Sequence, residues 1–180
     1  MLAAKQVADL ITISRALLTP LMLWLGVTQG PAALPLICWL MFYDWLGDSL
    51  DGPIARRSRV YYHTWVGDHD LEVDIVASFG LLLYLLAAGF VDLRLAGVYL
   101  VLWALVLWRW GVPRVLGLLI QAPIYGWFLW VALRQAPAAG LWDVGLILGL
   151  MVVTWPRFPR EIVPGFLQGL RDVWEQYRRG

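Results

Sequence analysis

The chain has 180 residues, of which 61% are hydrophobic and only 15% are charged, and its formal net charge is +1 at pH 7. This composition, a mean hydropathy of +0.68 and 12 tryptophans exclude an ordinary soluble globular protein. They predict an integral membrane protein with a single domain over residues 1–180, and we expect no nucleic-acid partner. The lone Cys38 lies in an apolar run, which excludes a disulfide framework and a thiolate metal site.

The apolar runs predict an all-α fold of six transmembrane helices with a cytoplasm-facing polar pocket. With their flanks, these runs are long enough to cross a hydrocarbon core of about 30 Å. The third expected helix starts in an acidic cluster, and the sixth is short and has Asp143 near one end. A turn is expected at 28–31 and a polar loop after Arg56. The expected helices cover residues 9–27, 32–51, 75–91, 95–108, 115–133 and 142–155.

The basic residues predict the orientation of the chain in the membrane. If both termini are cytoplasmic, only Arg94 and Arg134 of the 14 Lys and Arg residues lie on the opposite side. We therefore expect a multi-pass protein of the inner (cell) membrane with both termini in the cytoplasm. The tail, 156–180, carries apolar residues at helical spacing among arginines, which favours an amphipathic helix on the inner membrane surface over a solvated tail.

More than half of the 13 acidic residues lie within positions 44–74. On a helix, Asp48 and Asp51 share one face, and Asp70 and Asp74 share another, because their spacings are i, i+3 and i, i+4. Two such pairs facing each other would form an oxygen-lined pocket suited to Mg²⁺ or Mn²⁺. Structural ion pairs with nearby arginines are the alternative, but carboxylates inside a membrane are costly and usually functional.

Other residues of this acidic block have less specific roles. Gly52 and Ala55 leave room beside the pocket for a bulky ligand. Asp44, one helical turn before the first pair, is expected to line the pocket rather than to bind the metal. His63 and His69 have no metal-ligand spacing, so we interpret them as loop residues.

The block also carries an ordered motif. It reads Asp48-x-x-Asp51-Gly52-x-x-Ala55-Arg56, followed by Asp70-x-x-x-Asp74. This order resembles the signature of the CDP-alcohol phosphatidyltransferase family, D-x-x-D-G-x-x-A-R followed after a spacer by G-x-x-x-D-x-x-x-D. The first half matches at every fixed position.

The second half of the motif departs from the family pattern. Val66 stands where the family has its glycine, and the nearest glycine is Gly67. A register shifted by two residues would make Asp68 and Glu72 the second acidic pair. We prefer the unshifted register, because it keeps two aspartates and because a loop absorbs an extra residue more easily than a helix does.

A second resemblance lies upstream of the acidic block. The segment reads Asp9-x-x-Thr12-x-x-Arg15-x-x-x-x-Pro20. It is similar to the N-x-x-T-x-x-R-x-x-x-x-P with which members of the same family commonly begin their first membrane helix. Only Asp9, in place of asparagine, differs.

The resemblance implies a transferase of phospholipid biosynthesis, similar to a phosphatidylglycerophosphate synthase. Such enzymes move a phosphatidyl group from CDP-diacylglycerol to a small alcohol and release CMP. The acceptor is open, with glycerol 3-phosphate as one candidate, and the family fold implies a homodimer in contact with membrane lipids. The implied ligands of Mg²⁺ or Mn²⁺ are Asp48, Asp51, Asp70 and Asp74.

The resemblance also assigns roles within the reaction. Asp74 would be the catalytic general base that takes the proton from the attacking hydroxyl. Gly52 and Ala55 would admit the nucleotide, and Arg56 would contact its phosphates. Arg109 and Arg114 are expected as membrane anchors or, functionally, as a binding site for a phosphate on the acceptor.

Two other functions remain open from the sequence. A non-catalytic partner subunit with the same fold would account for the displaced glycine, although the four aspartates argue against it. A metal-ion transporter would also use intramembrane aspartates, but it requires a polar path through the bilayer, and the outer halves of the expected helices offer almost none.

Overall fold

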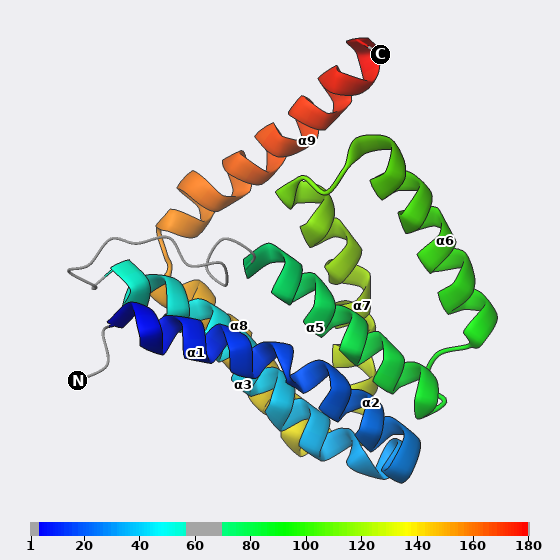
Figure 1. The fold of residues 1–180 in the computed structure, drawn as a ribbon. Helices are drawn as coiled ribbons and strands as arrows, with labels where there is room; N and C mark the ends of the chain where they lie inside the picture. Colours follow the sequence, from blue (N-terminus) through cyan, green and yellow to red (C-terminus); the bar gives the residue numbers. More distant parts are fainter. Residues whose placement is uncertain (1–3, 57–69, 180) are drawn as a thin grey trace.

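The computed structural model describes residues 4–56 and 70–179, with only the backbone described at 4, 5, 51–56, 70, 176, 177 and 179. All regular structure in these ranges is helical (Figure 1), so the expected all-α class is correct. The elements are α1 (Ala4–Ala16), α2 (Leu18–Gln29), the 3₁₀ helix η1 (Gly30–Ala33), α3 (Leu34–Arg56), α5 (Asp70–Ala87), α6 (Leu93–Trp110), α7 (Arg114–Gln135), α8 (Pro137–Val153), the π-helical η2 (Phe158–Ile162) and α9 (Val163–Arg179).

Three helical stretches in the described ranges are long and apolar enough to cross a membrane. They are Gln6–Leu50, Leu93–Trp110 and Arg114–Gln135, and a fourth results if Pro137–Val153 and Phe158–Glu175, bent by 81°, count as one span. The first stretch folds back on itself at η1, so that α1 packs against α3 (Figure 1). Gly30 makes this reversal with a φ of +58°, inside the turn expected at 28–31.

The helix expected over 9–27 is present but interrupted at Leu17, a single turn residue with helical dihedral angles between α1 and α2. Pro20 has no N–H to donate to the carbonyl of Ala16, which removes the hydrogen bond that would carry the helix through this point. The break leaves Arg15 in the last turn of α1, where its side chain turns toward α3 and α5.

Helix α5 crosses α2 at very short range. A Cβ on Gly80 would lie 2.7 Å from the Cα of Thr19, so only glycine allows this approach. The Thr19 hydroxyl donates to the carbonyl of Val76 over 3.0 Å, which ties the same crossing together. At its start, α5 meets α7, where the side chain of Leu71 lies against Gly117. These contacts fix the N-terminal end of α5 beside the α1–α3 pair.

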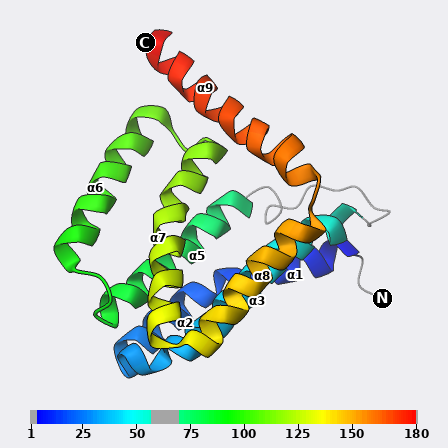
Figure 2. The same ribbon diagram turned by 180° about the vertical axis from the view of Figure 1, so that it is seen from behind.

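Helices α7 and α8 form a hairpin that covers the other side of α3 (Figure 2). The hairpin is tight, because a Cβ on Gly140 would lie 2.9 Å from the backbone of Ala132. Helix α6 is largely uncovered by the rest of the described chain, and α9 points away from the other helices (Figure 1). The described acidic residues of positions 44–74 lie on α3 and α5, two helices of the bundle that both pack against α1.

Candidate functional site

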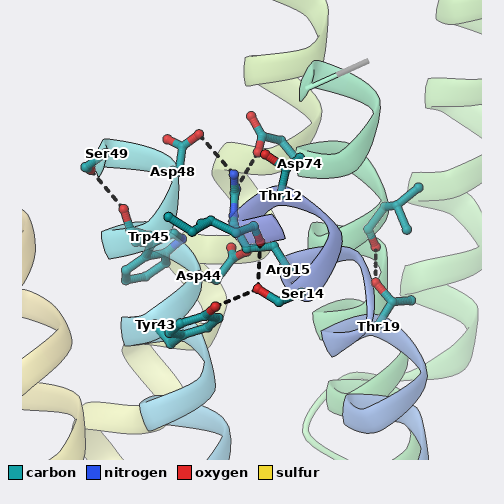
Figure 3. Close-up of polar contacts among 12 residues, drawn as sticks. Thr12, Ser14, Arg15, Thr19, Tyr43, Asp44, Trp45, Asp48, Ser49 and Asp74 are labelled. Carbon is teal, nitrogen blue, oxygen red and sulfur yellow. Dashed lines mark hydrogen bonds and ion pairs between the residues drawn. The ribbon is translucent and has the colours of Figure 1, made fainter. Parts of the chain in front are cut away.

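The polar centre of the bundle is the side chain of Arg15. Its Nε donates to Oδ1 of Asp44 over 3.0 Å, Nη1 donates to Oδ1 of Asp48 over 3.4 Å, and Nη2 donates to Oδ1 of Asp74 over 2.5 Å (Figure 3). One arginine from α1 thus joins two carboxylates of α3 to one of α5. We call these four residues the Arg15 cluster.

The members of the Arg15 cluster differ in solvent exposure, from a buried end at Asp44 to an open end at Asp48. The side chains of Arg15 and Asp44 are 2% and 1% exposed, whereas those of Asp74 and Asp48 are 23% and 47% exposed. Among the described side chains, three carboxylates face this one guanidinium. Asp48 and Asp74 are therefore the two members that a cation or a substrate can reach.

The carboxylate of Asp44 is only half satisfied. Its Oδ1 accepts from Arg15, but Oδ2 is buried and has no hydrogen-bond partner among the described residues. A buried carboxylate oxygen without a donor is unfavourable, because its hydration is lost and not replaced.

The local sequence explains how the Arg15 cluster forms. Asp44, Gly47 and Asp48 lie at i, i+3 and i+4 and so share one face of α3. A Cβ on Gly47 would lie 3.1 Å from Cδ of Arg15, so the glycine leaves space for the arginine stem. A second link between α1 and α3 is the 2.6 Å hydrogen bond between Ser14 Oγ and Tyr43 Oη (Figure 3).

Several predicted site residues lie at the edges of the described structure. The backbone of Asp51, Gly52, Ala55 and Arg56 forms the end of α3, and Asp70 begins α5, but their side chains are not described. By helical spacing, positions 51 and 70 fall on the faces of their helices that carry Asp48 and Asp74.

The shifted register would use Asp68 and Glu72, of which only Glu72 lies among the described residues. Glu72 is exposed, whereas Asp74, two residues later on α5, reaches Arg15. The remaining residues of that region named above lie outside the described residues: His63, Val66, Gly67, Asp68 and His69.

Arg109 and Arg114 flank the connection between α6 and α7. Both are exposed, and Arg109 stacks 5.7 Å from the ring centroid of Trp110. Arg114 begins α7, whose next turn packs at Gly117 against Leu71 of α5, so this connection and the start of α5 lie at the same end of the bundle. Neither arginine forms an ion pair with the acidic side chains that the structure describes.

The predicted metal can be tested against these positions. Among the described side chains, no group of three or more His, Cys, Asp or Glu residues is arranged to hold a metal ion. The donor chemistry nevertheless fits a hard divalent cation, because partly exposed carboxylates of both motif halves, Asp48 and Asp74, meet at the open end of the Arg15 cluster. In this structure the Arg15 guanidinium forms ion pairs with the carboxylates of Asp48 and Asp74.

Sequence reasoning missed the central role of Arg15 and the contributions of Asp44 and Gly47. Arg15 entered only as part of the upstream resemblance, and Asp44 only as a lining residue. A signal was present: a charged residue inside an apolar run needs a counter-charge within the bundle, and the nearest acidic run in the sequence was the block that begins at Asp44.

A second buried carboxyl group lies between α3 and α8. Asp143 was expected near one end of its helix, but it lies inside α8 and is 0% exposed. Neither of its carboxyl oxygens has a hydrogen-bond partner among the described residues, and the thiol of Cys38 on α3 is its polar neighbour. This site is separate from the Arg15 cluster.

No family model, curated protein or solved structure matches this chain, so its function has to follow from the chemistry of its side chains. The Arg15 cluster offers two kinds of group for that purpose. Its partly exposed carboxylates can bind a cation or accept a proton, and its guanidinium can neutralise or orient negative charge.

Proposed function

We propose that this protein is a CDP-alcohol phosphatidyltransferase, which transfers a phosphatidyl group from CDP-diacylglycerol to an alcohol and releases CMP. One observation carries the proposal. The three separate segments of the sequence resemblance each contribute a side chain to one cluster: Arg15 from the first, Asp48 from the second and Asp74 from the third.

A purely structural ion pair would not need this arrangement. Asp44 alone provides the buried partner that a buried arginine requires. Asp48 and Asp74 add negative charge at positions that solvent reaches, where ion pairs contribute little to stability. Their presence is better explained by binding and chemistry than by folding.

Mg²⁺ or Mn²⁺ is the proposed cofactor, and its ligands would be Asp48, Asp51, Asp70 and Asp74. When bound, such a cation neutralises charge on the diphosphate of the CDP-lipid and on the departing CMP. Arg56 at the end of α3 would contact the nucleotide phosphates, and Gly52 and Ala55 would leave space for the cytidine.

Asp74 is the proposed general base. It accepts the proton of the acceptor hydroxyl while the oxygen of that hydroxyl forms a bond to the lipid-bearing phosphorus. The bond from this phosphorus to the CMP oxygen breaks, and CMP leaves with the electron pair. The Arg15 guanidinium donates to Oδ1 of Asp74 and would orient the carboxylate for this role.

The placement of α5 supports the unshifted register of the second acidic pair. Asp74 faces the Arg15 cluster, whereas Glu72 is exposed and points elsewhere. On a helix, two residues that differ by two positions lie on nearly opposite sides, so both registers cannot serve the same site. We therefore propose Asp70 and Asp74 as the second pair.

The acceptor alcohol would approach from the cytoplasmic side. Arg109 and Arg114, at the same end of the bundle as the start of α5, are proposed to bind a phosphate on the acceptor, such as that of glycerol 3-phosphate. Six membrane crossings, cytoplasmic termini and a homodimer in the inner membrane complete the proposal. A reporter fused after Gly180 should then report the cytoplasm, and one inserted at Gly30 the opposite side.

The direct test is an assay of CMP release. Purified protein is incubated with CDP-diacylglycerol, Mn²⁺ or Mg²⁺ and a panel of alcohols that includes glycerol 3-phosphate, inositol phosphate and phosphatidylglycerol. We expect CMP release that depends on one acceptor and that equals the amount of phosphatidyl product. Absence of release with every acceptor would favour the non-catalytic partner subunit, and metal uptake into vesicles without release would favour a transporter.

A further inference from the structure

The unpartnered oxygen of Asp44 is unusual because a suitable donor lies beside it. Arginine and carboxylate groups pair most strongly through two parallel hydrogen bonds. Arg15 gives Asp44 only its Nε, at 3.0 Å from Oδ1, and directs Nη1 and Nη2 to Asp48 and Asp74 instead. Oδ2 of Asp44 is left buried without a donor among the described residues.

We propose that Arg15 is a built-in counter-ion, which releases Asp48 and Asp74 when a divalent cation binds and then forms a two-pronged pair with Asp44. This inference rests on the proposed function, because it takes Asp48 and Asp74 as metal ligands. It assigns Arg15 and Asp44 as positioning residues, which act on the metal-binding carboxylates and touch neither metal nor substrate.

The geometry provides a fixed end and a releasable end for this exchange. The Nε bond to Asp44 lies in the driest part of the Arg15 cluster, where both side chains are 2% exposed or less. The bond from Nη1 to Asp48 is long, at 3.4 Å, and involves a side chain that is 47% exposed. Water and ions compete at that end, so the outer contacts are the ones expected to exchange.

The 2.5 Å contact with Asp74 is shorter than the contact with Asp48, the other outer partner among the described side chains. Its loss is compensated in two ways. The cation replaces the positive charge beside Asp74, and the guanidinium gains the free Oδ2 of Asp44 as an acceptor. Gly47 has no side chain in the way of the arginine stem, which therefore lies close against α3 beside both Asp44 and Asp48.

The proposed exchange gives Arg15 a role in the metal-free protein. Carboxylates gathered in a bundle repel one another, and an internal guanidinium relieves this repulsion until a cation arrives. The same guanidinium then competes with the cation, so it lowers the affinity for metal while it stabilises the metal-free protein.

The test is direct Mn²⁺ binding to the purified full-length protein in nanodiscs, followed through the electron paramagnetic resonance signal of free Mn²⁺. Arg15→Gln should bind Mn²⁺ about tenfold more tightly, because a positive charge a few ångströms away is removed. Asp44→Asn should bind it roughly 10- to 100-fold more weakly, because the guanidinium loses its alternative partner and stays on the ligands. Arg157→Gln, which removes an exposed arginine paired with Glu161, is the matched control and should not change the affinity.

The opposite signs of the two effects decide the question. If Arg15 only held the carboxylates in place, both variants would weaken Mn²⁺ binding, and that result would overturn the proposal. Thermal unfolding gives a second readout: Arg15→Gln should be less stable than the wild type in EDTA and should recover most of the loss with Mn²⁺. If Arg15→Gln does not fold, the Mn²⁺ affinity of Asp44→Asn tests the proposal by itself. Unchanged or tighter Mn²⁺ binding by that variant contradicts the exchange.

Failure of the proposed function gives a different pattern. A wild-type protein without saturable Mn²⁺ binding would have no metal site, so the proposed function and the exchange would both fall. Saturable binding with the two opposite effects, but without CMP release, would support the exchange and contradict the transferase.

Discussion

Two buried aspartates, Asp44 on α3 and Asp143 on the neighbouring α8, differ in their surroundings. Asp44 is 1% exposed and Asp143 is 0% exposed, so neither meets water. Asp44 accepts a hydrogen bond from Arg15, whereas the carboxyl group of Asp143 has no charged partner among the described residues and lies beside the thiol of Cys38.

The difference shows which buried acid can take part in chemistry. Asp143 has no counter-charge among the described residues, and an isolated buried charge is unfavourable. A carboxylate beside a guanidinium can remain charged. Arg15 provides this counter-charge to Asp44 and also pairs with Asp48 and Asp74 at the open end of the cluster. The counter-ion, rather than burial or acidity alone, distinguishes the candidate site from the structural acid.

The largest effect is expected for the activity of an Asp74 variant. Asp74→Asn keeps the shape of the side chain but removes the proton acceptor, so the rate of CMP release should fall by roughly 10²- to 10⁴-fold. Glu72→Gln, two residues away on the exposed side of α5, is the matched control and should keep nearly full activity. Equal losses in both variants would mean that α5 contributes no specific base, and loss in Glu72→Gln alone would favour the shifted register.

The next effect concerns the stability of the Arg15 cluster. Arg15→Met removes the counter-charge and leaves Asp44 buried and unpaired, so the free energy of unfolding in EDTA should fall by about 3–5 kcal/mol. Denaturant unfolding in mild detergent measures this, with Arg94→Met at an exposed position as the control.

A double variant sharpens the comparison of the two acids. Adding Asp44→Asn to Arg15→Met removes the unpaired charge and should recover part of the lost stability, whereas adding Asp143→Asn should recover none. If Asp143→Asn recovered stability instead, the unpaired charge left by Arg15→Met would be at Asp143 and not at Asp44, which contradicts the account.

A smaller effect is expected at the glycine that accommodates the arginine. Gly47→Leu places side-chain atoms where the Arg15 stem lies, and overpacking of this kind costs about 1–3 kcal/mol. Gly145→Leu is the matched control, because a Cβ at that glycine of α8 meets no atom within 4 Å in the described chain. Similar stability of the two variants, measured by thermal unfolding, would show that the space at Gly47 has no role.

The smallest effect is expected at Asp143. Asn has nearly the same shape as a neutral carboxyl group, so Asp143→Asn should change the free energy of unfolding by less than about 1 kcal/mol and leave CMP release unchanged. Asp44→Asn, which removes the partner of Arg15, should destabilise the protein clearly more. A severe loss of activity in Asp143→Asn would contradict the assignment of this residue as structural.

Much of the helical framework could be predicted from hydropathy, because each apolar run is bounded by charged residues or by Pro and Gly. The runs expected at 95–108 and 115–133 correspond to α6 (Leu93–Trp110) and α7 (Arg114–Gln135) within a few residues. The break at Leu17 was missed, since Pro20 is an acceptable residue in the first turn of a helix and the hydropathy does not change there.

The members of the candidate site were less predictable than the helices. Helical spacing placed Asp48 and Asp51 on one face, because that relation is local. The pairing of Arg15 with Asp44 and Asp74 depends on how α1, α3 and α5 cross, and periodicity within one helix carries no information about such contacts. The need for glycine at position 47 likewise depends on the position of the Arg15 side chain on the neighbouring helix, which the sequence of α3 does not predict.

The central claim is that the acidic end of the bundle is a metal-dependent phosphatidyl-transfer site, and the metal dependence of CMP release tests it most directly. Purified wild-type protein with CDP-diacylglycerol and its acceptor is assayed after treatment with EDTA and again after Mg²⁺ or Mn²⁺ is restored. The account predicts that release stops in EDTA and returns with either cation, because carboxylates are the proposed ligands. Full release in EDTA, or no release under any condition, would contradict it.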